Sequence, residues 1–152
     1  MQGPTLAVIR RVYAAFGVGL VVMATGALAI VDFGTTSALT EAVALTIPVA
    51  AAIGIGVIAL LGRKALTAPT DDAARANYMV LFILRVAFAE APALLGLVGA
   101  FVLEASIVSI WGLALTAVPF VMAAPSDRDL DHRQAQLRAA GSPVDLRAAL
   151  RA

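Results

Sequence analysis

The sequence predicts an all-α integral membrane protein, built as a four-helix up-down bundle with a short helical cytoplasmic tail at its C-terminal end. Two observations carry this prediction. First, 61% of the 152 residues are hydrophobic and only 14% are charged, whereas an ordinary soluble domain has about 25% charged residues. Second, the hydrophobic residues are gathered into four long runs, and the basic residues lie almost entirely outside these runs. A mean hydropathy of +0.94 agrees with this class.

Each run has the length of a membrane span. A helix needs about 20 mostly apolar residues to cross a bilayer, and the runs predict spans near residues 12–31, 42–61, 78–103 and 107–124. The membrane domain therefore covers residues 1–124, and residues 125–152 form the tail. Because the connections between the runs are short, we expect consecutive spans to be neighbours that run in opposite directions.

The basic residues predict the orientation of the spans. Arg85 lies inside the third span, whereas the other ten of the eleven Lys and Arg residues precede the first span, separate the second from the third, or follow the fourth. Since cytoplasmic loops are enriched in Lys and Arg, we expect both termini in the cytoplasm. The composition, rich in Ala and Arg, is typical of GC-rich bacterial genomes, so the expected location is a bacterial cytoplasmic (inner) membrane.

The tail has the signals of two short helices. Ser126 is a good N-cap for a helix that begins at Asp127, and Gly141 is a good terminator. Ser142 followed by Pro143 predicts a second helix start. Each helix has two leucines on one face, which are Leu130 and Leu137 in the first and Leu146 and Leu150 in the second. Two arrangements fit this pattern: helices under the membrane with arginines toward lipid headgroups, or helices docked on a partner protein.

The residue inventory argues against catalysis and cofactor binding. The chain has no cysteine, which excludes disulfides and thiolate metal sites. His132 is the only histidine, and one histidine without clustered partners makes a poor metal site. No phosphate-binding loop, metalloprotease motif or serine elbow is present. A net charge of +1 gives no reason to expect nucleic-acid binding. We therefore expect no enzyme activity, no cofactor and no metal.

Glu90 is the residue that points most directly to function. It lies about 18 Å along the third span from Tyr78, and a charge at that depth costs at least ~2.5–3.5 kcal/mol. Glu90 is too short to reach the surface, so we expect it to be protonated, paired or in a polar cavity. Arg85 lies about 140° away around the same helix and is poorly placed to pair with it. Pro92 removes the usual donor to the Phe88 carbonyl, so Glu90, Arg85 and Pro92 are candidates for a proton or cation site.

Pairs of small residues mark expected helix contacts. Residues with small side chains four apart let two helix backbones approach closely in a membrane. The candidate pairs are Ala15 and Gly19, Ala50 and Gly54, Ala52 and Gly56, Ala89 and Ala93, and Gly96 and Ala100.

The region 50–103 resembles the helical hairpin of the proteolipid c subunits of rotary ATP synthases. The resemblance rests on Gly54-Ile55-Gly56 in the first helix, Arg63-Lys64 in the loop, and Ala89-Glu90-Ala91-Pro92 leading to Gly96-Leu97-Val98 in the second helix. It implies that Glu90 is the carboxylate that carries a proton or a sodium ion. Arg85 and the long loop 62–77 depart from the pattern of that family.

Two functions fit the sequence. The first is a non-enzymatic subunit or accessory of a larger membrane complex, or a homo-oligomer, in which Glu90 makes a hydrogen bond between helices. The expected partners are the lipid bilayer and other membrane subunits or a second copy of the chain. The alternative is a proton- or cation-handling protein, with Glu90 as the titrating group and Arg85 as the tuning charge. An enzyme acting on lipids has the least support, because no nucleophile and base are visible.

Overall fold

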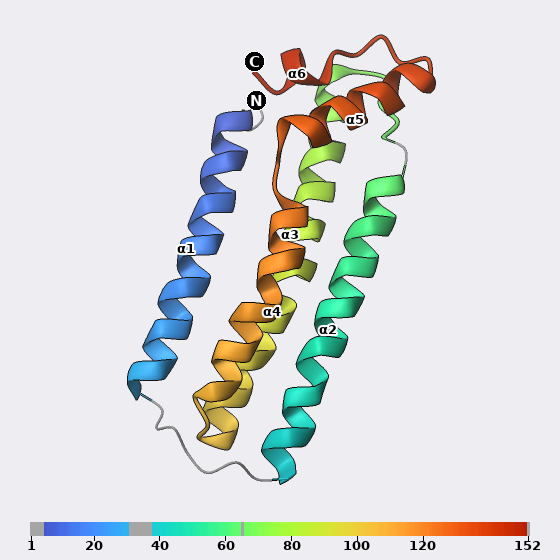
Figure 1. The fold of residues 1–152 in the computed structure, drawn as a ribbon. Coiled ribbons are helices and arrows are strands. Elements are labelled where there is room, and N and C mark those ends of the chain that lie inside the picture. Colours follow the sequence, from blue (N-terminus) through green and yellow to red (C-terminus); the bar gives the residue numbers. More distant parts are fainter. Residues whose placement is uncertain (1–4, 31–37, 65, 152) are drawn as a thin grey trace.

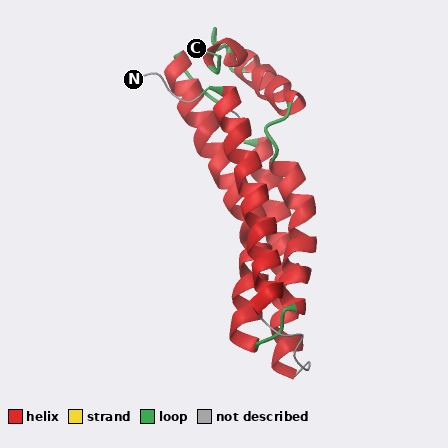
Figure 2. Cartoon of the chain, turned by 90° about the vertical axis from the view of Figure 1, so that its left-hand side faces the viewer, coloured by secondary structure: helices red, strands yellow, loops and turns green. Residues whose placement is uncertain are grey.

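The chain consists of helices joined by loops in a computed structural model, which describes residues 5–30, 38–64 and 66–151 (Figures 1 and 2). The long helices lie side by side and alternate in direction (Figure 1). They are α1 (Leu6–Ile30), α2 (Ala38–Arg63), α3 (Asp71–Leu103) and α4 (Ile107–Ala123). Two short helices follow, α5 (Asp127–Ala139) and α6 (Leu146–Ala149). They lie at the end of the bundle where α1 and α3 begin (Figure 1).

The prediction of an all-α protein with several apolar helices is confirmed. Within the described ranges, three helices are long and apolar enough to cross a membrane, over Leu6–Ala29, Leu45–Arg63 and Asp71–Leu103. The helix α4 has 17 residues, which is the lower limit for a span. It becomes a fourth candidate when it is taken together with α5, which bends away from it by 46°. The predicted end of the first span, Val31, lies outside the described residues.

The first three long helices are longer than the apolar runs that predict them, whereas α4 is one residue shorter than its run. The third span was expected from residue 78, but α3 begins at Asp71, where Thr70 is the N-cap and its side chain accepts a hydrogen bond from the amide of Ala73. Acidic residues at Asp71 and Asp72 favour this helix start through the helix dipole. Hydropathy identifies only the apolar part of a helix, so it missed this polar first part. The added turns bring Arg75 against the tail.

Glycines set the closest contacts between the long helices. A Cβ added to Gly96 of α3 would lie 2.8 Å from the Cα of Gly112 in α4. A Cβ added to Gly54 of α2 would lie 2.7 Å from the carbonyl oxygen of Phe88 in α3. Real Cβ atoms do not come this close to backbone atoms, so both contacts require glycine. The helix α3 therefore has tight backbone contacts with α2 on one side and α4 on another.

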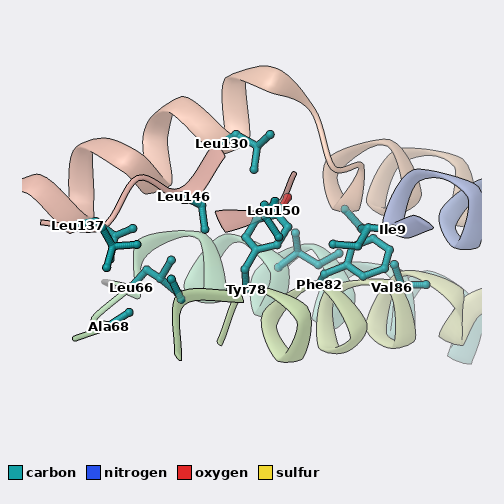
Figure 3. Close-up of a cluster of buried hydrophobic side chains, with 14 of the residues drawn as sticks. Ile9, Leu66, Ala68, Tyr78, Phe82, Val86, Leu130, Leu137, Leu146 and Leu150 are labelled. Atoms are coloured by element: carbon teal, nitrogen blue, oxygen red, sulfur yellow. The ribbon is translucent and has the colours of Figure 1, made fainter. Parts of the chain in front are cut away.

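A large hydrophobic cluster joins the tail to the bundle. Figure 3 shows leucines of α5 and α6 pointing toward α3, where they meet Tyr78, Phe82 and Val86. Ile9 of α1 belongs to the same cluster. All four tail leucines are completely buried: Leu130, Leu137, Leu146 and Leu150. The apolar faces of the tail are thus covered by the chain's own bundle. The placing of its arginines toward headgroups, or of the tail on a partner protein, stays a prediction.

The first tail helix begins and ends as predicted, whereas the second does not. Ser126 accepts a hydrogen bond from the amide of Asp129 at 3.2 Å, and Gly141 has a φ of 73° just beyond the end of α5. The predicted start at Ser142 is wrong. The N-cap of α6 is Asp145, whose side chain accepts from the amides of Arg147 and Ala148. The Ser142 hydroxyl instead donates to the carbonyl of Ala68 at 2.7 Å, which ties the tail to the loop before α3.

Candidate functional site

Glu90 borders an open groove between α1 and α3. Only 9% of the residue is exposed. The groove has a volume of about 460 Å³ and continues into a second hollow of about 260 Å³, which shares Val12, Phe16 and Glu90 with it. We call the larger hollow the Glu90 groove. Its lining residues are Val12, Ala15, Phe16, Gly19, Leu20, Met23, Glu90 and Leu94.

The Glu90 carboxyl has no partner in the part of the chain that the structure describes. Its Oε1 atom is buried and makes no hydrogen bond. The rest of the lining is apolar, so the groove places neither an opposite charge nor another polar side chain beside the carboxyl. A buried polar group without a partner costs about 1–3 kcal/mol. The groove therefore offers one hydrogen-bonding group in an otherwise apolar surface.

The first predicted pair of small residues lies on the wall of this groove. A Cβ added to Gly19 would meet no atom within 4 Å, and Ala15 is exposed. Neighbouring Phe16 is 46% exposed. The structure thus places Ala15 and Gly19 on a free face of α1, and no helix within the described residues covers them.

The other predicted small residues lie inside the bundle, apart from Ala52 and Gly56, which are exposed. Gly54 and Gly96 form the close backbone contacts with α3 and α4 described above. The three alanines of α3 that belong to predicted pairs are buried, with exposures of 0% for Ala89, 8% for Ala93 and 0% for Ala100. Ala50 of α2 is half-buried. The α3 residues therefore contribute to packing within one chain.

Pro92 does not share the groove with Glu90. Pro92 is fully buried, and its carbonyl oxygen lies 2.6 Å from the position of a Cβ added to Gly112 in α4. The carbonyl of Phe88, which loses its helical donor to Pro92, faces Gly54 of α2. A C–H···O contact with a glycine partly replaces such a missing donor. The carboxyl and the proline break therefore face different neighbouring helices, unlike the combined site expected from the sequence.

Arg85 pairs with the tail. Its Nη1 donates to Oδ1 of Asp129 at 2.8 Å, and the Tyr78 hydroxyl donates to Oδ2 of the same carboxylate at 3.3 Å. Both members of the ion pair have side chains that are only 11% exposed. Arg133 approaches the same carboxylate, with its Nε 3.8 Å from Oδ1. We call Tyr78, Arg85, Asp129 and Arg133 the Asp129 cluster. Arg85 thus has its own counter-ion, and no ion pair links it to Glu90 among the described side chains.

Arg133 holds the C-terminal end of α2. It is 1% exposed, and its guanidinium donates to the carbonyls of Leu61 and Lys64, each at 2.8 Å. The last carbonyls of a helix lack helical donors and carry partial negative charge, so they help to compensate a buried cation. Burial lowers the pKa of the Arg133 guanidinium, and the negative charge of Asp129 opposes this shift.

Two further contacts close the same end of the molecule. Arg75 of α3 donates to the carbonyl of Ala149 through Nε at 2.9 Å and Nη2 at 2.6 Å. The amide of Leu6, at the start of α1, donates to the carbonyl of Leu150 at 2.8 Å. The tail is therefore bonded to α1, α2 and α3 together.

The sequence did not predict that Asp129, Arg133 and Arg75 make the contacts that join the tail to the long helices. In the sequence Asp129 is one of the acidic residues that follow the Ser126 N-cap, and the structure places it in the first turn of α5. The available signal was Arg85 itself, because a buried cation needs a carboxylate, but Asp71, Asp72 and Glu104 are all nearer to it in the sequence than Asp129 is. Recognising the pair also required knowing that α5 folds back over α3.

Comparisons with protein-family models, curated proteins and solved structures found no match. The resemblance of residues 50–103 to the proteolipid c subunits therefore stays a prediction.

Proposed function

We propose that this is a non-enzymatic multi-pass membrane protein that associates, through the Glu90 groove, with a transmembrane helix of another subunit or of a second copy. In this proposal α1 to α4 span the bilayer as an up-down bundle, and α5 and α6 lie on the cytoplasmic side of a bacterial inner membrane. The observation that carries it is the unpartnered Oε1 of Glu90, buried at the edge of an apolar groove.

The shape of the groove supports a helix as its occupant. Gly19 and Ala15 give α1 a flat surface, which allows a second helix to approach closely. The incoming helix would bring a hydrogen-bond donor or acceptor to Glu90, and such an interhelical bond in a membrane is worth about 1 kcal/mol. The same contact would cover Phe16, which is 46% exposed.

The proposed orientation rests on the distribution of charge. The end of the bundle that α5 and α6 cover also holds the basic residues at the start of α1 and the end of α2, including Arg10, Arg63 and Lys64. Arg128, Arg138 and Arg151 add to it from the tail. Such a concentration of Arg and Lys is typical of the cytoplasmic face.

Ion handling by Glu90 has weaker support. A carboxyl at bilayer depth is a reasonable ion carrier, but the lining of the Glu90 groove offers no second polar group. Arg85, which was expected to tune Glu90, is engaged by Asp129. The two functions make opposite predictions for Glu90→Gln. An amide keeps the hydrogen bond and so preserves association, but it cannot titrate and so abolishes proton or cation transfer.

The test compares the assembly of variants by native electrophoresis and co-purification from membranes in a mild detergent. Gly19→Leu fills the groove and is expected to abolish association, while Glu90→Leu weakens it about fivefold, as loss of a ~1 kcal/mol bond requires. The matched control is Gly56→Leu, because a Cβ at Gly56 also meets no atom within 4 Å and Gly56 does not line the groove. Recovery of Gly19→Leu in the same assemblies as the parent protein would refute the proposal.

A further inference from the structure

A third hollow lies between the end of α2 and the start of α3, at the end of the bundle that the tail covers. Its volume is about 250 Å³. It is independent of the Glu90 groove and shares no lining residue with it. We call it the Lys64 pocket. The lining residues are Leu61, Lys64, Leu66, Thr67, Asn77, Val80, Leu81 and Leu84.

The Lys64 pocket changes from polar to apolar along its length. Lys64 and Thr67 come from the loop after α2, and Asn77 faces this loop, because its amide Nδ2 donates to the carbonyl of Thr67 at 2.9 Å. Val80 and Leu84 lie one and two turns further along α3. They are 56% and 40% exposed, so the apolar part of the pocket opens onto the outer surface of the bundle.

The tail fixes the polar end of this pocket. The carbonyl of Lys64 accepts a hydrogen bond from Arg133 at 2.8 Å, and the hydroxyl of Ser142 holds the carbonyl of Ala68 at 2.7 Å. Leu66, which is only 2% exposed, is anchored in the hydrophobic cluster. The backbone on both sides of Thr67 is therefore held by contacts that do not use the Lys64 side chain.

The Lys64 ammonium group is free to bind an anion. Lys64 is exposed, and its side chain makes no ion pair or hydrogen bond with the residues that the structure describes, unlike Arg75, Arg85 and Arg133. Three donors on a flexible stem suit a phosphate group. Basic pockets between membrane helices on the cytoplasmic side bind anionic lipid headgroups.

We propose that the Lys64 pocket binds an anionic phospholipid. The ammonium of Lys64 pairs with the lipid phosphate, Thr67 and Asn77 surround the headgroup, and an acyl chain lies along Val80 and Leu84. A free phosphate ion shares the headgroup chemistry, but it leaves the apolar half of the pocket empty. The order of polar and apolar groups along the pocket matches that of a phospholipid at the boundary between headgroups and hydrocarbon.

The test measures lipid retention by native mass spectrometry, with phosphatidylglycerol or phosphatidylcholine added to the full chain in detergent. The parent protein is expected to retain phosphatidylglycerol in preference to phosphatidylcholine. Lys64→Gln should reduce phosphatidylglycerol retention about fivefold, as the ~1 kcal/mol per basic residue near an anionic surface implies. Val80→Trp, which blocks the apolar half of the pocket, should reduce the retention of the same lipid.

Arg63→Gln is the matched control, because it removes the same charge from the adjacent exposed residue, which does not line the pocket. It should retain lipid like the parent protein. Equal losses in Lys64→Gln and Arg63→Gln would show a diffuse charge effect and overturn the site. Equal retention of phosphatidylcholine, or displacement of the lipid by millimolar inorganic phosphate alone, would overturn the lipid assignment. These outcomes do not bear on assembly through Glu90, which has a separate readout.

Discussion

Arg85 and Glu90 lie five residues apart on α3, yet their surroundings are opposite. Arg85 belongs to the Asp129 cluster. There the Asp129 carboxylate pairs with Arg85, accepts a hydrogen bond from Tyr78 and lies close to Arg133. Glu90 faces an apolar groove and keeps a buried oxygen without a partner. The difference shows that one buried charged residue of α3, Arg85, has a counter-ion within the chain, whereas Glu90 has none among the described residues. Buried atoms without a hydrogen bond occur on both sides, since the Nε atoms of Arg85 and Arg133 also have none. Their guanidinium groups keep other partners, whereas the Glu90 carboxyl has none among the described residues.

The largest expected effect on stability comes from removing the carboxylate that pairs with Arg85. Asp129→Ala leaves Arg85 and Arg133 buried without their carboxylate, and removing one member of a buried ion pair costs about 3–5 kcal/mol. The free energy of unfolding, measured by denaturant titration in mixed micelles, should fall by that amount. Asp127→Ala is the control, because the Asp127 side chain is 65% exposed in its ion pairs and should change little. Equal effects of the two substitutions would contradict the role of the Asp129 cluster.

The second prediction compares Gly112, which lies in a tight contact between two helices, with Gly19, which faces open space. Gly112→Ala places a Cβ 2.6 Å from the carbonyl oxygen of Pro92, so α3 and α4 must separate and stability should fall by about 1–3 kcal/mol. Gly19→Ala faces open space and should be neutral or slightly stabilising, since Ala is the better helix former. Thermal unfolding of both variants in the same detergent checks this. A loss in Gly19→Ala as large as in Gly112→Ala would mean that the groove is closed in the folded chain.

Replacing Glu90 should change stability in the opposite direction. In the purified monomer, Glu90→Leu removes a buried polar group without a partner, and stability should rise by about 1–2 kcal/mol. The same variant should assemble less well, so stability and association should move in opposite directions. Unfolding of monomeric protein in detergent gives the first quantity. Glu104→Leu serves as the control, because Glu104 is exposed at the end of α3. Destabilisation of the Glu90→Leu monomer would show that Glu90 has a partner within the chain.

The smallest effect is expected at an exposed set of charges on the tail. Arg147 pairs with Asp127 at 3.3 Å and with Asp131 at 2.9 Å, and its hydrogen bond to Asp131 raises the pKa of the Arg147 guanidinium. Exposed pairs contribute little because water and salt screen them. Arg147→Ala should therefore leave the unfolding midpoint unchanged within error at physiological salt. A clear shift would indicate that these exposed pairs, and not the Asp129 cluster, hold the tail.

The parts of the fold that depend on local sequence could be predicted. Apolar runs located the long helices. The start of α5 at Ser126 and its end near Gly141 were predictable because each depends only on residues a few positions away in the sequence. The start of α3 at Asp71 was missed, because a polar helix extension has no hydropathy signal. The start of α6 was also missed, because Ser142 is used in a contact with Ala68 and not as a cap.

The candidate site was predictable only in part, for a physical reason. Glu90 was identified because a carboxyl in an apolar run is costly wherever it lies. Its surroundings, and the pairing of Arg85 with Asp129, depend on the packing of α1 and α5 against α3. Residues 44 positions apart meet there, and a single sequence contains no periodic pattern that reports such a contact.

The separation of Arg85 from Asp129 also has a consequence for biosynthesis. In the proposed orientation, the ribosome makes Arg85 44 residues before the carboxylate that neutralises it. The third span therefore enters the membrane with an unpaired cation, which opposes its insertion. Asp129 follows α4 in the chain, so it can pair with Arg85 only after α4 has been made. The carboxylate that pairs with the third long helix is thus made after all four long helices, and chains cut before Asp129 lack it.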